Sequence, residues 1–507
     1  MLEKKYLRLQ NGSDVRGVAL EGVEGENVNL TSEIVYHIVG AFAHFVSEKY
    51  GKALDNIKIA VGHDSRLSAN MLKEGALKGI QAQGCVAVDC SLSSTPSMFM
   101  STILDGLCFD GAIMITASHL PFNRNGLKFF TKEGGLESKD IKVLLQKAIE
   151  LEQNGVIENI KHEVISCDLL KYYSANLRSI ICKELECSEE SLPLSGMHIV
   201  VDAGNGAGGF FASEVLEKLG ADIRGSLYLN PDGTFPNHIP NPEDKKAMEA
   251  IGKATVDNGA DLGIIFDTDV DRAATVLSNG KEINKNALIA LMSAILVKDY
   301  PNSTIVTDSV TSDQLEDFLV NKLGLKHHRF KRGYRNVINE SIRLNNEGIV
   351  SPLAIETSGH GALSENYFLD DGAYMSVKIL IEAVKCKRNG QSLESLLEGL
   401  EEALEAKECR LRILVEDFKE YGLNVLEDFK VFAKENHFVV VEPNYEGVRI
   451  SFNNDEVQGW MLVRMSLHDP ILPINIEANT EGGVEKILSY VRPFFKQYEQ
   501  LNVESLG

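Results

Sequence analysis

The pattern that most constrains this chain is a short apolar strand followed by a polar or glycine-rich turn and an amphipathic helix. The unit recurs about three times, with strands expected at 57–61, 198–202 and 304–307. Such alternation predicts α/β layers around parallel or mixed sheets. We therefore expect three similar mixed-sheet α/β domains, at residues 1–190, 191–299 and 300–408. From Asp417 one helix and several strands predict a smaller C-terminal α+β domain, at 409–507.

The same pattern places further elements. Strands are expected at 112–115, 262–266 and 353–355, and helices at 68–84, 168–181, near 212–219 and near 312–323. The acidic stretch 187–193 reads as a linker between two of the domains.

Composition excludes some partners. The 507 residues include 51 basic and 73 acidic side chains, a net charge of −22. Nucleic acid and anionic membranes both need a basic face, so neither is expected as a partner. No apolar run is long enough for a signal peptide or a membrane span. The eight scattered cysteines form no CxxC motif, which is typical of buried thiols in a reducing cytoplasm, so we expect a cytoplasmic protein.

Three carboxylates at alternate positions, Asp267, Asp269 and Asp271, directly follow the expected strand at 262–266. At the mouth of one strand they can converge on a hard cation such as Mg²⁺. The segment is not an EF-hand loop, because Arg272 and Ser278 stand where that loop needs Gly and Glu. A solvated acidic turn is the alternative, but repulsion among three close carboxylates disfavours it without a cation. Arg272 could hold an anionic ligand beside that cation.

A second polar loop, at 116–121, follows the expected strand at 112–115 and contains Ser118 and His119. A Ser beside a His suggests a nucleophile, and Lys128 could serve as its base or charge partner. The G-x-S-x-G frame of a nucleophile elbow is absent. Taken alone, the loop is more typical of turn and cap residues. The acidic loop favours the catalytic interpretation, because phosphoryl transfer uses a Ser oxygen near Mg²⁺.

Three other loops follow expected strands. Residues 204–209 satisfy G-x-G-x-x-G, but no acidic residue ends the next strand convincingly and a second mononucleotide half is hard to find. We therefore expect a tight strand-to-helix turn there rather than a dinucleotide site. The loop 356–360 offers donors and acceptors that suit sugar hydroxyls, although an ordinary polar turn would look similar. Arg464 and Ser466 could hold a phosphate or could pair locally.

Several basic residues fall at strand ends or beside glycines: Arg16, Arg66, Lys331, Arg332 and Arg335. Singly, each is more typical of a solvated salt-bridge partner.

Taken together and in this order, these stretches resemble the α-D-phosphohexomutase superfamily, which includes phosphoglucomutase and phosphomannomutase. The resemblance runs from about Gly12 to the last strand. Its motifs are S-D-V-R-G at 13–17, G-H-D-S-R at 62–66, T-A-S-H-L-P at 116–121, N-G-L-K at 125–128, P-D-G-T-F-P with N-P-E at 231–243, and D-T-D-V-D-R at 267–272. Residues 333–335 are similar to the loop that helps distinguish sugars, and 356–360 to the G-E-x-S-G-H sugar loop. The departures here are His63 for Arg, Leu120 for Asn and Ile355 for Gly.

The resemblance implies four domains around a central cleft and a phosphorylated Ser118. It implies one Mg²⁺ held by Asp267, Asp269, Asp271 and the phosphoserine. Lys128 and His119 would lie near the proton transfers, with Arg16 in the same catalytic set. The implied substrate-binding residues are Arg66, Arg272, Gly333, Tyr334, Arg335, Glu356, Ser358, His360, Arg464, Ser466 and His468. In such a site the cation and arginines neutralise the transferring phosphoryl group, while the sugar loop fixes which hydroxyl faces it.

The last loop departs from the family pattern R-x-S-G-T-E-P-x-x-R. Arg464, Ser466 and Pro470 match it, whereas the Gly, Thr, Glu and closing Arg are replaced by Leu467, His468, Asp469 and Pro473. Loss of one charge-assisted contact to phosphate costs on the order of 1.5–3 kcal/mol, or about ten- to a hundredfold in affinity. His468 could restore part of it.

An S-L-H-D-P loop of this kind resembles the branch of the superfamily that makes glucose 1,6-bisphosphate. Members of that branch are phosphorylated by fructose 1,6-bisphosphate and pass the group to glucose 1-phosphate or 6-phosphate. Our leading hypothesis is therefore a hexose-bisphosphate synthase that releases the bisphosphate. The alternative is a phosphoglucomutase or phosphomannomutase in which His468 and its neighbours replace the lost ligands.

A third alternative is a catalytically silent sugar-phosphate sensor, which should lack the nucleophile or a metal ligand. The sequence retains Ser118, Asp267, Asp269 and Asp271, which disfavours a sensor. Sugar preference, the phosphoryl donor and the oligomeric state stay open.

Overall fold

The computed structural model describes residues 2–155, 163–466 and 469–507. By its internal contacts the chain divides into two compact units. Unit 1 comprises residues 1–284 and 358–396, and unit 2 comprises residues 285–357 and 397–507.

Unit 1 begins with a mixed sheet in the order β1-β2-β6-β5-β3-β4-β8, with β7 paired to β6. Its strands are β1 (Gln10–Asn11), β2 (Asp14–Val18), β3 (Lys58–His63), β4 (Val86–Leu92), β5 (Gly111–Ile115), β6 (Arg124–Thr131), β7 (Gly134–Gly135) and β8 (Ile165–Ser166). The pairs β3–β4, β3–β5 and β4–β8 are parallel, and β6 is antiparallel to β2 and β5. The carboxyl ends of β3 and β5 therefore lie side by side, with His63 opposite Ile115.

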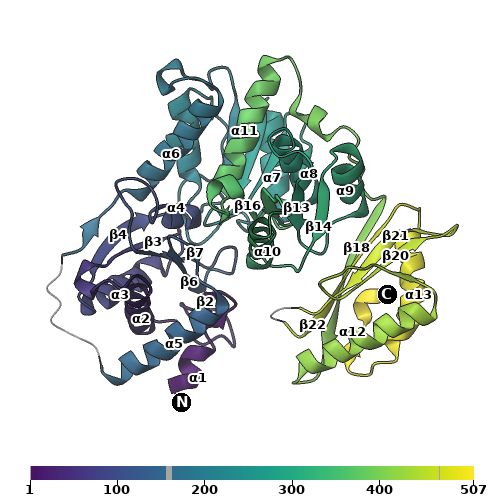
Figure 1. The fold of residues 1–507 in the computed structure, drawn as a ribbon, viewed down its shortest axis with the longest axis horizontal. Helices are drawn as coiled ribbons and strands as arrows, with labels where there is room; N and C mark the ends of the chain where they lie inside the picture. Colours follow the sequence, from purple (N-terminus) through teal and green to yellow (C-terminus); the bar gives the residue numbers. More distant parts are fainter. Residues whose placement is uncertain (1, 156–162, 467–468) are drawn as a thin grey trace. The chain divides into compact units, whose positions relative to one another are not determined.

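The helices around this sheet are α1 (Leu2–Leu7), α2 (Ser32–Tyr50), α3 (Ala69–Ala82), α4 (Thr95–Met100), α5 (Ser138–Gln153) and α6 (Leu169–Glu184). Helices α2, α3 and α5 share one apolar core with the sheet and lie together in Figure 1. Helix α3 approaches α2 so closely that only glycine fits at Gly75 and Gly79. A Cβ at either position would lie 2.3 Å from a backbone oxygen of α2. Glycines four residues apart therefore present a smooth face to α2.

A second, smaller sheet in unit 1 has the order β12-β11-β10-β9. Its strands are β9 (Ile199–Asp202), β10 (Leu262–Phe266), β11 (Ala273–Leu277) and β12 (Glu282–Ile283). β9 and β10 are parallel, and helix α7 (Lys245–Asp257) packs its apolar face on them. The hairpin of β16 (Gly361–Leu363) and β17 (Leu369–Asp370) and the helix α11 (Gly372–Arg388) complete the unit.

Unit 2 has an α/β part and a C-terminal part. The α/β part contains α8 (Lys285–Leu296), β13 (Thr304–Thr307), α9 (Asp313–Asp317), β14 (Lys326–Arg329), α10 (Tyr334–Asn346) and β15 (Leu353–Ile355). β13 runs parallel to both β14 and β15.

The C-terminal part is a sheet in the order β19-β20-β21-β22-β18-β23, with two helices packed on one face (Figure 1). Its elements are β18 (Glu405–Ile413), α12 (Phe418–Glu435), β19 (Val439–Val440), β20 (Val448–Asn453), β21 (Gln458–Val463), β22 (Ile471–Ala478), α13 (Gly483–Lys496) and β23 (Leu501–Asn502). Phe429 of α12 packs on Phe494 and Phe495 of α13, which joins the two helices over the sheet.

The predicted α/β class, with a C-terminal β-rich domain, is confirmed. Two predicted helices are irregular: 212–219 is a π-helical turn (Phe211–Leu216) and a 3-10 turn (Glu217–Leu219), and 312–323 is α9 followed by a π-helical turn (Phe318–Lys322). Strand β18 lies on both sides of the boundary expected at 409.

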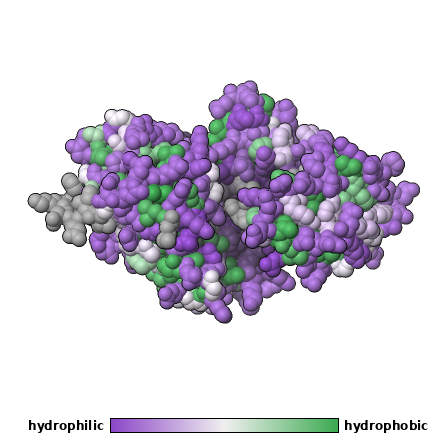
Figure 2. All heavy atoms as spheres, turned by 90° about the horizontal axis from the view of Figure 1, so that it is seen from below, coloured by the Kyte–Doolittle hydropathy of each residue, from purple (hydrophilic) through white to green (hydrophobic). Residues whose placement is uncertain are grey.

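Two surface properties bear on the expectations from composition. The face drawn in Figure 2 is mainly hydrophilic, with hydrophobic side chains in separate patches. Within the described ranges, no helix has both the length and the apolar character that a membrane crossing requires.

Five cysteines are buried as expected, but Cys167 and Cys187 are partly exposed and Cys108 is exposed, so the expectation of buried thiols was wrong for these three.

Candidate functional site

The loop that carries Ser118 takes its shape from the turn after the neighbouring strand β3. Thr116 donates its hydroxyl to Asp64 at 2.7 Å and accepts the Ser118 backbone N–H at 2.9 Å. Ser118 is 8% exposed and has a φ of +50°, a left-handed conformation that is uncommon for a residue with a Cβ. Burial raises the pKa of Asp64 to about 6, against the opposing effect of Arg66. A buried chain of polar contacts therefore holds the serine in place.

Arg66 holds the same loop from the other side. Its guanidinium donates to the carbonyl oxygens of Leu120 at 2.6 Å, Pro121 at 2.8 Å and Arg124 at 3.1 Å, and to that of Ser118. It also pairs with Asp64 and is only 2% exposed. The sequence predicts Arg66 as a substrate ligand. In the structure its Nη atoms donate to loop backbone, so it supports the loop, and its role as a substrate ligand stays a prediction.

The acidic loop follows β10 and packs on the glycine turn that follows β9. The Ala207 N–H donates to the Thr268 carbonyl at 2.8 Å, and a Cβ at Gly206 would lie 2.5 Å from that oxygen. The G-x-G-x-x-G stretch is thus the tight turn that the sequence favours, and its glycines let the two loops touch.

The carboxylates of Asp267, Asp269 and Asp271 are fully buried, and their ligand atoms lie within 4.8 Å of one another. Asp267 accepts hydrogen bonds from the Ser118 hydroxyl and the Arg272 Nε, each at 3.0 Å. Asp269 accepts the Thr95 hydroxyl, and Asp271 pairs with Lys128 at 2.6 Å.

One oxygen each of Asp269 and Asp271 has no hydrogen-bond partner among the described residues. A buried carboxylate oxygen without a partner is costly. Two such oxygens, with Asp267 and the Ser118 hydroxyl beside them, are the donor set that a hard divalent cation takes. The residues present therefore fit Mg²⁺.

The carboxylates differ in their electrostatics. Burial, and then the neighbouring Asp271, raise the pKa of Asp267 well above its usual value. The pKa of Asp271 lies below its usual value, because Lys128, His360 and Arg272 together outweigh burial. Of these two carboxylates, the surrounding basic groups favour the ionised form of Asp271.

Arg272 connects the acidic loop to the serine. Its Nη2 donates to the Ser118 Oγ at 2.9 Å and to the His119 Nδ1 at 2.5 Å, and its Nη1 donates to Asn241 at 3.1 Å. Burial, followed by Arg272, lowers the pKa of His119 to about 3, so its imidazole is neutral at pH 7. An arginine in this position can stabilise negative charge that develops at the serine oxygen.

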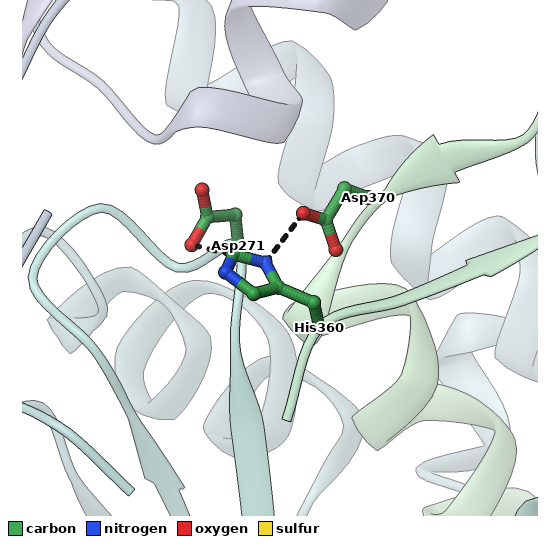
Figure 3. A group of neighbouring side chains, drawn as sticks. All are labelled: Asp271, His360 and Asp370. Atoms are coloured by element: carbon green, nitrogen blue, oxygen red, sulfur yellow. Dashed lines mark hydrogen bonds and ion pairs between the residues drawn. The ribbon is translucent and has the colours of Figure 1, made fainter. Parts of the chain in front are cut away.

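His360 lies between Asp271 and Asp370 (Figure 3). Its Nδ1 is 2.5 Å from Asp370 Oδ2 and 3.9 Å from Asp271 Oδ1. Although burial alone lowers it, Asp370 and Asp271 raise the pKa of His360 to about 9. These three residues are also of metal-ligand type, but the protonated ring makes them an ion-paired cluster.

Arg16 lies beside the Ser118 loop. It donates to the Thr116 carbonyl at 2.8 Å and pairs with Asp14 at 2.8 Å. Unit 1 therefore brings together Arg16, Arg66, Ser118, His119, Lys128, Asp267, Asp269, Asp271, Arg272 and His360, and it also contains the buried Ser358.

The other predicted substrate residues belong to unit 2. The Gly333 N–H donates to Glu356 at 2.6 Å, so the two predicted sugar loops meet there. Tyr334 and Arg335, partly exposed, open helix α10.

The predicted phosphate loop lies in the same unit, directly after β21. Arg464 is 8% exposed, and burial lowers its pKa against the opposing charge of Glu446. Glu446 accepts the Ser309 hydroxyl and the Arg332 N–H, which ties it to the Gly333 loop. Ser466 accepts the Asp469 N–H at 3.2 Å, and His468 lies outside the described residues.

Sequence reasoning missed five supporting residues: Asp64, Thr95, Asn241, Asp370 and Glu446. Asp64 and Asn241 lie inside recognised motifs, but the sequence did not reveal that they contact Thr116 and Arg272. Thr95 follows Ser94, which caps α4 with its side chain, and a capping box can be found in a sequence.

Comparison with known proteins identifies the class of enzyme to which the fold and the site belong. The chain matches three models described as phosphoglucomutase/phosphomannomutase, alpha/beta/alpha: domain I over residues 8–155, domain II over 171–280 and domain III over 284–403. These domains define the α-D-phosphohexomutase class of enzymes. The chain belongs to the phosphoglucomutase/phosphomannomutase family, as its motifs predict.

Curated relatives cover almost the whole chain. A phosphomannomutase/phosphoglucomutase of Pseudomonas aeruginosa is 28% identical over 94% of each chain. A phosphoglucomutase/phosphomannomutase of Thermococcus kodakarensis is 28% identical over 96% of this chain and 97% of the relative. A phosphoglucomutase of Neisseria gonorrhoeae is 26% identical over 92% and 93%. All three names are those of mutases.

Solved structures share the fold. A phosphoglucomutase/phosphomannomutase family protein of Burkholderia thailandensis superposes with a TM-score of 0.77 at 24% identity, covering 96% of this chain and 97% of that chain. The open form of the phosphoglucomutase parafusin of Paramecium gives a TM-score of 0.71 at 15% identity, covering 96% and 95%.

Proposed function

We propose that the protein moves a phosphoryl group between the 1- and 6-positions of a hexose phosphate through Ser118, as a phosphoglucomutase or phosphomannomutase. One observation carries the proposal. The Ser118 Oγ lies 3.0 Å from an Asp267 oxygen and 2.9 Å from the Arg272 guanidinium, beside two unpartnered carboxylate oxygens. The mutase names of the relatives support this reading over a synthase.

In this proposal Asp267, Asp269, Asp271 and the Ser118 oxygen hold Mg²⁺. When bound, the cation neutralises charge on the transferring phosphoryl group. Arg272 donates to the same serine oxygen, so it stabilises the charge that develops there when the phosphoryl group leaves.

The proton transfers are assigned to His119 and Lys128. His119 lies beside the Ser118 oxygen, with its Nδ1 3.3 Å from the Ser118 Oγ, so its ring is close to the reacting groups. Lys128 presents an ammonium group, held by Asp271 at 2.6 Å, that can donate a proton. Arg16 completes the catalytic set from its place beside Thr116.

The hexose is assigned to the loops at 333–335 and 356–360, with its other phosphate on Arg464, Ser466 and His468. A solved N-acetylphosphoglucosamine mutase of Aspergillus fumigatus with a TM-score of 0.54 is described in complex with glucose 1,6-bisphosphate. That complex supports a hexose bisphosphate as the phosphoryl donor or activator for this fold. A cytoplasmic enzyme acting on free sugar phosphates remains our expectation.

One observation favours a second candidate, a glucose 1,6-bisphosphate synthase. The Arg464 N–H donates to the Pro473 carbonyl at 3.1 Å, so position 473 lies beside Arg464 on the sheet. The family pattern places its closing Arg at this position, and proline supplies no charge there. A weaker grip on the phosphate would let the bisphosphate leave as product.

Phosphorus NMR separates the two candidates. The protein is incubated with Mg²⁺, glucose 1-phosphate and fructose 1,6-bisphosphate. Catalytic conversion to glucose 6-phosphate with traces of bisphosphate would establish the mutase. Stoichiometric glucose 1,6-bisphosphate with fructose 6-phosphate would establish the synthase. A parallel run with mannose 1-phosphate tests the sugar preference, and no transfer to any of these sugars would overturn the proposal.

A further inference from the structure

The carboxylate of Asp370 is fixed to the β16–β17 hairpin at two points. Its Oδ1 accepts the Gly361 N–H at 3.0 Å, and its Oδ2 accepts from the His360 Nδ1 at 2.5 Å. Asp370 is 6% exposed. One oxygen thus anchors the carboxylate to backbone while the other fixes the plane of the imidazole ring, which leaves the ring little freedom to rotate.

The backbone at His360 is tied to the acidic loop. His360 and Arg272 form an antiparallel β-bridge, and the Ala273 N–H donates to the Gly359 carbonyl at 3.4 Å. Behind the bridge, the Gly372 N–H donates to the Val270 carbonyl at 3.1 Å, and a Cβ at Gly372 would lie 2.7 Å from the Arg272 backbone. The segment that carries Asp370 therefore packs directly on the loop that carries Asp271.

The fixed ring borders the oxygen that lacks a partner. Figure 3 shows the His360 ring between the two carboxylates, with dashed lines to both. Its Nδ1 is 3.9 Å from the Asp271 Oδ1, while the other Asp271 oxygen is held by Lys128. Lys128 thus holds one Asp271 oxygen, while the other lies 3.9 Å from both the His360 Nδ1 and the Arg272 Nε.

We propose that Asp370 is a positioning residue, which holds the His360 ring beside Asp271 and so keeps the Asp271 Oδ1, which has no hydrogen-bond partner, directed at the cation. The inference rests on the proposed metal-dependent function. Partners that orient a metal ligand are typically worth about 10- to 100-fold in metal affinity. Because Asp370 acts through His360, we expect its loss to weaken the affinity by about tenfold.

The test is a titration with Mn²⁺ alone, followed by electron paramagnetic resonance on the full-length protein without substrate. Asp370→Asn should weaken Mn²⁺ binding by about tenfold. His360→Asn should weaken it similarly, and the double variant should be no weaker than His360→Asn. Glu340→Gln is the matched control, because Glu340 is a buried carboxylate of unit 2 that holds His328 at 2.9 Å in the same manner. Its Mn²⁺ affinity should equal that of the wild type.

An affinity of Asp370→Asn within about twofold of the wild type would overturn the inference, and so would fully additive losses in the double variant. Circular dichroism establishes that each variant is folded. If Asp370→Asn does not fold, His360→Asn decides the question by the same criterion. Mn²⁺ binding involves no sugar. A wild-type protein that binds Mn²⁺ but transfers no phosphoryl group would therefore contradict the proposed function and leave this result standing.

Discussion

The Ser118 region of unit 1 and the Arg464 region of unit 2 are built in different ways. Around Ser118, oppositely charged groups are buried together and hold one another, and the three carboxylates of the acidic loop place ligand atoms within 4.8 Å of one another. Around Arg464, the neighbouring charges include the carboxylates Glu446 and Asp308 and the guanidinium of Arg332. The adjacent loop of Tyr334 and Arg335 is partly exposed. The sequence of the first region keeps the metal-loop motif unchanged, whereas the second departs from its motif.

This difference predicts how substitutions in each region should affect the enzyme. The groups assigned to chemistry are fixed by contacts within the protein, so a change to one of them disturbs several others. Arg464, which is assigned to recognition, lies in the field of Glu446, whose negative charge opposes a substrate phosphate. We therefore expect variants of the first region to lower kcat and variants of the second to change KM.

The largest effect is expected from Ser118→Ala. It removes the proposed carrier of the phosphoryl group, so kcat should fall by about four orders of magnitude or more. The measurement is conversion of glucose 1-phosphate in the presence of a hexose bisphosphate. Thermal unfolding should stay close to that of the wild type, which excludes misfolding as the cause. Full turnover in this variant would refute the assignment of Ser118.

Next in size is Asp269→Asn, which removes a proposed metal ligand with an unpartnered oxygen. We expect kcat to fall by about 100-fold or more. Saturating Mg²⁺ should stabilise the wild type by about 2.7 kcal/mol at a hundred times its Kd, and the variant by much less. Calorimetry with and without chelator measures this. Equal stabilisation of both proteins would place the cation elsewhere.

Arg66→Met tests whether the serine loop depends on its buried support. The variant leaves Asp64 buried without its partner, which typically costs about 3–5 kcal/mol of folding free energy. A displaced loop can cost about 100-fold in kcat. KM should change little, because the Nη atoms of Arg66 donate to backbone carbonyl oxygens of the serine loop. Urea unfolding and steady-state kinetics measure the two effects. A raised KM with unchanged kcat would instead make Arg66 a substrate ligand.

Arg464→Ala tests the proposed phosphate-binding role of the unit 2 region. Loss of a charge-assisted contact should raise KM for the hexose phosphate by about ten- to a hundredfold, with a smaller change in kcat. Steady-state kinetics with Arg332→Ala alongside would show how much each arginine contributes. A fall in kcat at unchanged KM would mean that the two regions do not divide recognition from chemistry.

The smallest effect is expected from Glu446→Gln. The amide keeps the acceptor for the Arg332 N–H but removes the charge that faces Arg464. A partly exposed charge interaction is typically worth about 0.2–1 kcal/mol, so KM should fall by roughly two- to fivefold. Inhibition by inorganic phosphate should strengthen in parallel. A raised KM would show that Glu446 supports the loop more than it competes with the substrate.

Sequence alone identified the serine loop and the acidic loop because each directly follows a buried strand and keeps its own spacing. It predicted Arg66 as a substrate ligand but could not reveal its support of the serine loop, since the acceptors are backbone carbonyl oxygens more than fifty residues away. Thr95 was missed for a similar reason, because it meets Asp269 across 174 residues. Asp370 was missed although its partners Gly361 and His360 are only nine and ten residues away, because it lies outside the recognised motifs. The irregular helices at 212–219 and 312–323 keep an apolar face, so periodicity did not reveal them.

The central claim is that Ser118 carries the phosphoryl group with the acidic loop beside it. The most direct measurement is mass spectrometry of the peptide that contains Ser118, after incubation with Mg²⁺ and glucose 1,6-bisphosphate. The account predicts one phosphate on Ser118 that is lost on addition of glucose 6-phosphate, and none when the metal is chelated. Turnover of the sugar phosphate with Ser118 unmodified throughout would contradict it.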